Sequence, residues 1–543
     1  MATRRWLALP LLGVAALCVS CPRTEAPQQV SAPGHAAAAP PPSPRAPAMP
    51  SAQNAPDEAR PLGPSPPGNQ AIDTALPLPP ELVDDGSDDW LDEPVEAEGP
   101  APDKPAHLLG SVARETWIYT EPRWGSRRIG YLRAGARVTR RAKPAGFSSC
   151  EGGWYRVEPH GYVCNGSAAT LDMEHPVLAA ATRRPRMDTL PYTYVMSRNP
   201  SPPVYARLPT VAEQAQVEPD LRSILRGLES KRRDPDFVSA PPADALPATL
   251  QSGRAMPLLA NAGRAPDALL AERAKARSGY ALLATFDDEG RRFGMTTELG
   301  LVPIDRTRII RPSSFSGMRL DEAIGLPVAF VKTRRAVRHH LEGAALRTGE
   351  ALEWRQPIPL GKGRMQRGGQ TYWQALDGSW VRADQMTRVD RFQSEPSWAG
   401  SGRKWIDVSI LKQSLTAYEG GRPVYVTLVS TGADGLGDPD KTHSTIQGAF
   451  LIHTKHVTAT MDGDDVGDEF DLRDVPFVQY FTEGYALHGA YWHDDFGTPR
   501  SHGCVNLAPL DAAWLFGWTT PDVPATWHGA LTLRKGTLVY VHP

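Results

Sequence analysis

The chain has 543 residues, including 53 prolines and 48 glycines, and a formal net charge of -2. This length is too great for a single hydrophobic core, so the sequence predicts several domains. A basic patch or stripe is the usual sign of a nucleic-acid partner, and the near-neutral charge gives no ground for expecting one.

Residues 1–20 are typical of a secretory signal peptide. Arg4 and Arg5 form a positively charged start, and an apolar run over 6–19 follows. This run is short for a membrane span. The sequence therefore predicts an exported protein.

The end of this segment, Leu-Cys-Val-Ser-Cys over 17–21, resembles a bacterial lipobox. The resemblance implies that Cys21 carries a lipid and that the protein is a membrane-anchored lipoprotein at the periplasmic face. Cys18 departs from the pattern, because leucine is commonest at that place. Plain cleavage nearby, which gives a soluble secreted protein, is the alternative.

Residues 21–106 are predicted to form a disordered tether. Proline and alanine dominate its first part, and such a composition buries too little apolar surface to offset the entropy of ordering. Residues 84–98 are strongly acidic, which indicates a solvated, self-repelling spacer, with a site for a basic partner as the alternative. A polyproline-like chain advances about 3 Å per residue, so this tether can hold folded domains far from a membrane.

The positions of the five cysteines predict different roles for them. Cys18 leaves with the signal and Cys21 takes the lipid, while Cys150 and Cys164 can form a disulfide inside one small domain of an exported protein. Cys504 is left alone. A single leftover thiol is a candidate nucleophile, although a buried, inert cysteine is the alternative.

Residues 107–172 show short alternating runs separated by glycine and proline turns, a pattern that favours a small β-barrel. The ending Trp154-Tyr155-Arg156-Val157, followed by Gly161-Tyr162-Val163, resembles the bacterial SH3-like domain. Copies of that domain usually accompany cell-wall enzymes.

This ending recurs twice, which predicts a second SH3-like unit over 186–320 and a third over 326–395. Its counterparts begin at Phe293 and at Tyr372. The second unit contains an insertion near 210–275, in which four apolar residues fit one face of a helix: Leu221, Ile224, Leu225 and Leu228. Aromatic residues in these units are expected in the core, with glycan or peptide binding as the alternative.

From residue 403 onward the pattern changes to two long alternating runs joined at Glu419–Arg422, a hairpin signal. A helix is predicted over 509–518, with Pro509 in its first turn. Further strands are predicted at 449–452, 478–481, 485–488 and 537–541. The region is therefore mostly β, and the layouts of α/β hydrolases and papain-like enzymes are disfavoured.

His488-Gly489 and, after a loop, Ser501-His502-Gly503-Cys504-Val505-Asn506 resemble the signature of the L,D-transpeptidase (YkuD-type) catalytic domain over 403–543. Supporting pieces stand at 406–408, 429–432 and 448–450. The sequence departs mildly at 444–447, where a Thr-Pro-Thr element is common. The resemblance implies a β-sandwich catalytic domain.

The resemblance assigns Cys504 as nucleophile and His488 as base and proton donor. A neighbouring imidazolium lowers a cysteine pKa, which predicts an activated thiol. The Gly489 carbonyl is expected to orient the histidine ring. The amides of Gly503 and Cys504, with His502, are expected to form an oxyanion hole, and Ser501 and His502 to shape the site.

The implied reaction is acyl transfer in two steps. Cys504 attacks the carbonyl before the terminal D-alanine of a peptidoglycan tetrapeptide stem, and an amine of another stem resolves the thioester. Hydrolysis, which makes a carboxypeptidase, or transfer to a protein amine are alternatives. A wall-binding scaffold lipoprotein without activity is the alternative of another class. Carbapenem-type β-lactams are the expected inhibitors, and no metal or cofactor is expected.

Two kinds of metal site are alternatives for the region. A zinc site of the local histidines and Cys504 matches no common spacing. The acidic residues from Asp462 to Glu469 fail the EF-hand template, so a solvated loop is predicted, with attraction of an incoming stem ammonium group as the alternative. Four residues are candidates for a substrate loop: Tyr491, Trp492, His493 and Asn506.

Overall fold

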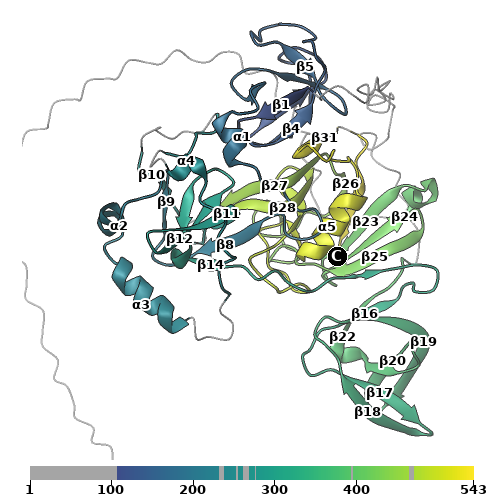
Figure 1. The fold of residues 1–543 in the computed structure, drawn as a ribbon. Coiled ribbons are helices and arrows are strands. Elements are labelled where there is room, and N and C mark those ends of the chain that lie inside the picture. Colours follow the sequence, from purple (N-terminus) through teal and green to yellow (C-terminus); the bar gives the residue numbers. More distant parts are fainter. Residues whose placement is uncertain are drawn as a thin grey trace, which may run out of the picture. The chain divides into compact units, whose positions relative to one another are not determined.

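The computed structural model describes residues 107–231, 238–251, 255–260, 268–275, 277–392, 396–463, 470–532 and 534–543 (Figure 1). All of them belong to one of the two compact units of the chain, Pro66–Pro543. The signal segment, Cys21 and the tether over 21–106 lie outside the described residues. No helix in the described ranges is long and apolar enough to cross a membrane.

The first β unit contains seven short strands and the helix α1 (Pro176–Ala180). Its strands are β1 (Leu108–Ser111), β2 (Thr116–Tyr119), β3 (Arg128–Leu132), β4 (Arg137–Thr139), β5 (Trp154–Arg156), β6 (Tyr162–Cys164) and β7 (Ala169–Thr170). Trp154 is fully buried, and Cys150 is bonded to Cys164, which joins the β5–β6 hairpin to the preceding loop.

The second β unit encloses a helical insertion. Its elements are β8 (Thr193–Ser197), β9 (Pro203–Tyr205), α2 (Val211–Val217), α3 (Leu221–Lys231), α4 (Ala248–Gln251), β10 (Leu270–Arg273), β11 (Gly279–Asp288), β12 (Arg291–Thr296), β13 (Leu301–Pro303), the 3-10 helix η3 (Ile304–Arg306) and β14 (Thr307–Ile309). The helix predicted from the leucine spacing is therefore α3. The last strand, β14, pairs with the first, β8.

The third β unit closes in the same way, because β22 pairs with β16. Its elements are β16 (Val328–Val331), β17 (Val337–Glu342), β18 (Ala345–Ala351), β19 (Pro357–Arg367), β20 (Gln370–Ala375), β21 (Trp380–Arg382), η4 (Ala383–Gln385) and β22 (Met386–Val389). The recurring sequence ending corresponds to a recurring antiparallel hairpin: β5–β6, β12–β13 and β20–β21.

The C-terminal domain follows η5 (Ser397–Ser401) and is built on strands of two sheets. One holds β23 (Lys404–Ser409), β24 (Ser414–Glu419), β25 (Arg422–Leu428), β26 (Gly448–Leu451) and β32 (Leu538–His542). The other includes β27 (Thr454–Gly463), β28 (Phe470–Thr482), β29 (Tyr485–Gly489), β30 (Val505–Leu507) and β31 (Gly529–Leu531). The hairpin predicted at 419–422 is confirmed.

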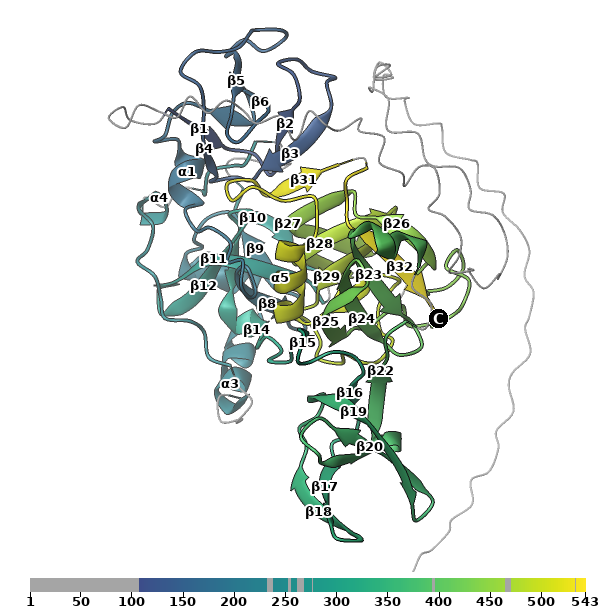
Figure 2. The same ribbon diagram turned by 90° about the vertical axis from the view of Figure 1, so that its right-hand side faces the viewer.

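Helix α5 (Pro509–Trp518) has the predicted bounds and packs with β28 and β29 (Figure 2). Apolar side chains of α5 and both sheets form one buried cluster, which includes Val408, Phe477, Leu487 and Phe516. One boundary is corrected. Met318–Arg319, placed by sequence in the second unit, forms β15 and pairs with β25 of the C-terminal domain.

Strand pairing joins the C-terminal domain to the first two units. β3 pairs with β31 in the antiparallel sense, and β11 meets β28 in the parallel sense where Gly279 lies beside Leu472. One buried apolar cluster also joins the second unit to the C-terminal domain. It contains Tyr194 and Ala281 of the second unit and Val475 and Tyr491 of the C-terminal domain.

A buried carboxylate, Asp474 on β28, lies where these parts meet. Its side chain is 2% exposed and pairs with Arg133, which follows β3. The hydroxyl groups of Thr297, after β12, and Thr458, on β27, donate to the same carboxylate at 2.6 and 2.7 Å. The charge of Asp474 is thus compensated by groups from the first unit, the second unit and the C-terminal domain.

Candidate active site

Parallel pairing of β29 and β30 brings the two halves of the motif together. His488 lies beside Asn506, and Leu487 lies beside Val505. Leu487 and Val505 both point into the cluster under α5. Cys504 directly precedes β30, and His488 lies one residue before the end of β29. The loop of the motif therefore folds back so that residues 505–507 lie beside residues 487–489.

His488 is buried, with 2% of its surface exposed. Its Nδ1 lies 3.2 Å from the carbonyl oxygen of Gly489, so Nδ1–H donates and Nε2 is left without a proton in the neutral ring. The Trp492 ring is 5.7 Å away. Burial lowers the pKa of His488 to about 4, and the hydrogen bond to Gly489 opposes this only in part.

Cys504 is partly exposed, and it is the one free cysteine of the described part of the chain. Its Sγ lies 3.7 Å from the carbonyl oxygen of Gly484. Burial raises the pKa of Cys504 to about 11, and a hydrogen bond from the Ala486 backbone opposes the shift. Desolvation disfavours the charged form of both groups, so this resting state differs from the predicted pair of an imidazolium and an activated thiol, which stays a prediction.

The pH dependence of alkylation tests this neutral resting pair. A thiol with a pKa of about 11 is mostly protonated at pH 7, so the rate of Cys504 alkylation by iodoacetamide should rise about tenfold per pH unit from pH 7 to 10. The rate should show no step near pH 6, since the pKa of His488 is about 4. A rate that is flat from pH 5 to 9 would indicate a thiolate–imidazolium pair instead.

Gly503 has a φ of 126°, a backbone conformation that glycine adopts without strain. A Cβ at this position would lie 2.8 Å from the Tyr485 ring. The Gly503 amide donates to Ser501 Oγ at 3.1 Å, and its carbonyl accepts from Thr445 Oγ1 at 2.7 Å. In this structure the Gly503 amide is thus bonded to a serine oxygen of the same loop, and its place in an oxyanion hole stays a prediction.

Ser501 and His502 differ in their surroundings. Ser501 is buried, and its hydroxyl also donates to the carbonyl of Cys504, so it fixes the loop on both sides of the cysteine. His502 is exposed, with its ring 4.4 Å from His443 and 5.0 Å from Phe470. These contacts place the His502 ring on the surface beside the motif.

Three of the four residues proposed for a substrate loop are buried supports. Tyr491 is 3% exposed and stacks on Tyr194 at 4.3 Å. His493 accepts at Nδ1 from the Asp495 amide, and its Nε2 lies 3.0 Å from the side-chain amide of buried Asn506. Since a neutral ring accepts at one nitrogen only, Nε2–H donates to the amide oxygen, which we orient toward it.

Burial, with Arg500 nearby, lowers the pKa of His493 to about 4, in keeping with a neutral ring. Among the four candidates, Trp492 alone is more than marginally exposed. The side chains of Tyr491, His493 and Asn506 thus hold this loop in place, and its contact with a substrate stays a prediction.

An ion pair that the sequence does not reveal holds the same loop. Arg355, between β18 and β19 of the third unit, lies 2.8 Å from a carboxylate oxygen of Asp494 and also donates to the Asp494 carbonyl at 3.2 Å. Its guanidinium stacks on Trp354 at 4.0 Å and on Phe315 at 4.7 Å. No local pattern marks Arg355, because its partner is 139 positions away.

In the described ranges, no group of three or more histidine, cysteine or acidic side chains is arranged to hold a metal ion. The acidic segment weighed as a calcium loop lies mostly at 464–469, outside the described residues.

The fold and the site define a mostly β domain with a histidine on one strand and a cysteine directly before the neighbouring parallel strand. Residues 403–541 match the YkuD family, the L,D-transpeptidase catalytic domain. A Bacillus subtilis protein named "Putative L,D-transpeptidase YciB" is 25% identical over 138 residues, which are 21% of this chain and 59% of that protein. The chain thus spans about three fifths of this curated relative.

The chain is also similar to solved structures. An L,D-transpeptidase from Stackebrandtia nassauensis is 26% identical, covering 26% of this chain and 56% of that one, with a TM-score of 0.19. The catalytic domain of an E. faecium L,D-transpeptidase is 23% identical, covering 26% and 98%, with a TM-score of 0.20. That E. faecium domain has also been solved acylated by ertapenem (25% identity, coverage 26% and 97%, TM-score 0.20). The family match over 403–541 assigns the domain.

Proposed function

We propose that the protein is a peptidoglycan L,D-transpeptidase that works through a thioester on Cys504. The observation that supports this proposal best is the parallel pairing of β29 with β30, which brings the two halves of the matched motif side by side, with Cys504 partly exposed and His488 oriented by Gly489. The unprotonated Nε2 of His488 is the base this reaction needs.

The neutral pair determines the order of events. As Sγ attacks the carbonyl of the stem peptide, its proton passes to Nε2 of His488, so no free thiolate accumulates. The carbonyl oxygen becomes an oxyanion, for which the amide of Cys504 is the donor we propose. Collapse breaks the C–N bond, and the imidazolium gives the proton to the amine of the departing D-alanine.

The thioester is then resolved by an amine of a second stem, with His488 taking up the amine proton and returning it to the cysteine sulfur. This yields a cross-link. Water in place of the amine would yield trimming. We propose that the reaction occurs at the periplasmic face, with the chain anchored through Cys21. A Cys21→Ser variant should lose membrane partitioning in cell fractions, and an unchanged distribution would contradict the anchor.

The function is tested with the purified chain and tetrapeptide stems. We expect release of D-alanine, cross-linked dimers in the mass spectrum, and a covalent ertapenem adduct on Cys504. The matched control is Cys504→Ala, which should give none of the three. If the unmodified chain gives no product or adduct while iodoacetamide still alkylates Cys504, the site is accessible but not a transpeptidase site.

A further inference from the structure

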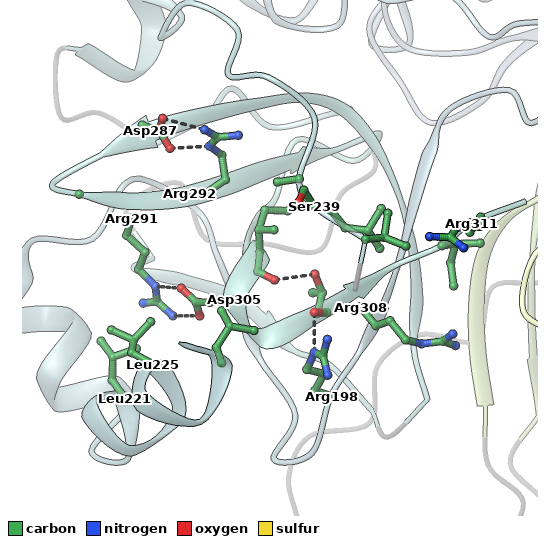
Figure 3. A pocket seen from close by; sticks show the side chains of 18 of the residues that line it. Arg198, Leu221, Leu225, Ser239, Asp287, Arg291, Arg292, Asp305, Arg308 and Arg311 are labelled. Atoms are coloured by element: carbon green, nitrogen blue, oxygen red, sulfur yellow. Dashed lines mark hydrogen bonds and ion pairs between the residues drawn. The ribbon is translucent and has the colours of Figure 1, made fainter. Parts of the chain in front are cut away.

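A groove of about 1350 Å³ runs from the helical insertion of the second unit to the loop beside His488 (Figure 3). Its walls come from α3, the β11–β12 hairpin, η3 and β14, and its far end from Tyr491 to Asp494. This volume exceeds the roughly 300 to 1,000 Å³ of a typical small-molecule pocket, which favours an extended ligand.

One wall of the groove is apolar. The leucine face of α3 lines it through Leu221, Leu225 and Leu228. Leu225 is 40% exposed, and Leu221 and Leu228 are half-buried. The apolar helix face that the sequence predicted is therefore partly open toward the groove (Figure 3).

Most acidic side chains of the lining are already compensated. Asp305 pairs with Arg291 at 2.7 Å, and Arg291 also binds Glu218 at 2.8 Å. Asp287 pairs with Arg292 on the same hairpin. Asp494 pairs with Arg355, as described above. Among the described residues that line the groove, Glu289, at the β11–β12 turn, is the acidic side chain without an ion pair.

Three arginines of the lining have no carboxylate partner within the described ranges: Arg198, Arg308 and Arg311. Arg198 Nε donates to the Thr307 carbonyl at 2.7 Å. Burial lowers the pKa of Arg198, and the adjacent charge of Arg308 lowers it further. Arg308 and Arg311 are exposed. The Arg308 guanidinium lies 3.8 Å from the sulfur of Met196. Adjacent guanidinium groups without counter-charges favour an anionic ligand.

One end of the groove lies beside the candidate active site. Trp492 lines it, and the centre of the Trp492 ring is 5.7 Å from that of the His488 ring. A ligand that extends from the arginines to Trp492 therefore contacts a direct neighbour of His488. Under the proposed function, the ligand at that place is a stem peptide, which carries free carboxylates and apolar methyl groups.

We infer that this groove binds an acidic stem peptide of the peptidoglycan strand, with carboxylates on Arg308 and Arg311 and apolar parts against α3. The inference rests on the proposed function. It assigns the second unit a part in binding the substrate, through the walls of this groove. Guanidinium groups bind carboxylates through two parallel N–H donors. A stem whose carboxylates are amidated has fewer acceptor oxygens and no negative charge there, so it should bind more weakly.

The test uses the full chain with Cys504→Ala, so that binding is measured without reaction. A fluorescent tetrapeptide stem with free carboxylates is titrated against this chain and against the same chain with Arg308→Gln and Arg311→Gln. We expect the Kd to rise about tenfold or more in the double variant. Arg364→Gln, an exposed arginine of β19 outside the groove, is the matched control and should leave the Kd unchanged. Equal thermal unfolding midpoints establish that the variants are folded.

Three outcomes would overturn the inference: an unchanged Kd in the double variant, no binding by the parent chain, or equal binding of a fully amidated stem. Tighter binding of polyphosphate than of the stem would also overturn it, by pointing to a phosphate polymer. Ertapenem acylation of the chain with intact Cys504 is measured separately. Its failure rejects the proposed function, whereas the stem titration alone decides the groove.

Discussion

Replacing His488 by glutamine is expected to slow formation of the Cys504 acyl-enzyme by about 10² to 10⁴-fold. Burial holds the thiol pKa at about 11 and the imidazole pKa at about 4, so the resting pair is neutral. The reaction must therefore remove the thiol proton as the sulfur attacks. Glutamine can keep a donor to the Gly489 carbonyl, but it supplies no basic nitrogen.

The measurement is single-turnover acylation by ertapenem, followed by mass spectrometry from pH 6 to 10. The rate of His488→Gln should approach that of the parent chain as pH rises, because hydroxide then deprotonates the thiol. His340→Gln, an exposed histidine of the third unit, is the matched control. Acylation of His488→Gln within twofold of the parent rate at pH 7 would remove His488 from the reaction.

Replacing Asp474 by asparagine is expected to lower the free energy of unfolding by about 3 to 5 kcal/mol. The substitution leaves Arg133, whose side chain is 14% exposed, without its charged partner. It also weakens the acceptor for Thr297 and Thr458. Asp474 has a φ of 53°, which asparagine tolerates, so the change isolates the charge from backbone strain.

Urea unfolding of the purified chain, followed by tryptophan fluorescence, measures this effect. Asp438→Asn is the matched control, because Asp438 forms an exposed pair with Lys441 and its loss should leave the unfolding midpoint unchanged. An Asp474→Asn midpoint equal to that of the parent chain would show that the buried pair does not stabilise the fold.

The sequence by itself determined much of the C-terminal domain. The alternation around Glu419–Arg422 predicted the β24–β25 hairpin, and the apolar run after Pro509 predicted α5 with its observed bounds. These features depend on neighbours within one turn or one strand pair, so their cause is local. The motif with His488 and Cys504 could likewise be found in the sequence, because both residues belong to one short segment that forms a single folded loop.

The tertiary structure alone decided how the site behaves. The pKa values of His488 and Cys504 depend on how much water the surrounding chain excludes, and residue type does not give that quantity. The amide of Gly503 was predicted to bind an oxyanion because glycine lets the backbone approach closely, and the folded loop turns this amide toward Ser501.

Contacts between residues far apart in the chain could not be predicted from the sequence either. Arg355 meets Asp494, and Arg133 meets Asp474, across separations of 139 and 341 positions that no sequence period connects. The apolar face of α3 was correctly predicted as a helix face, but whether that face is covered depends on the packing of distant strands. Its partial exposure in a groove beside Trp492 is therefore a result of the fold.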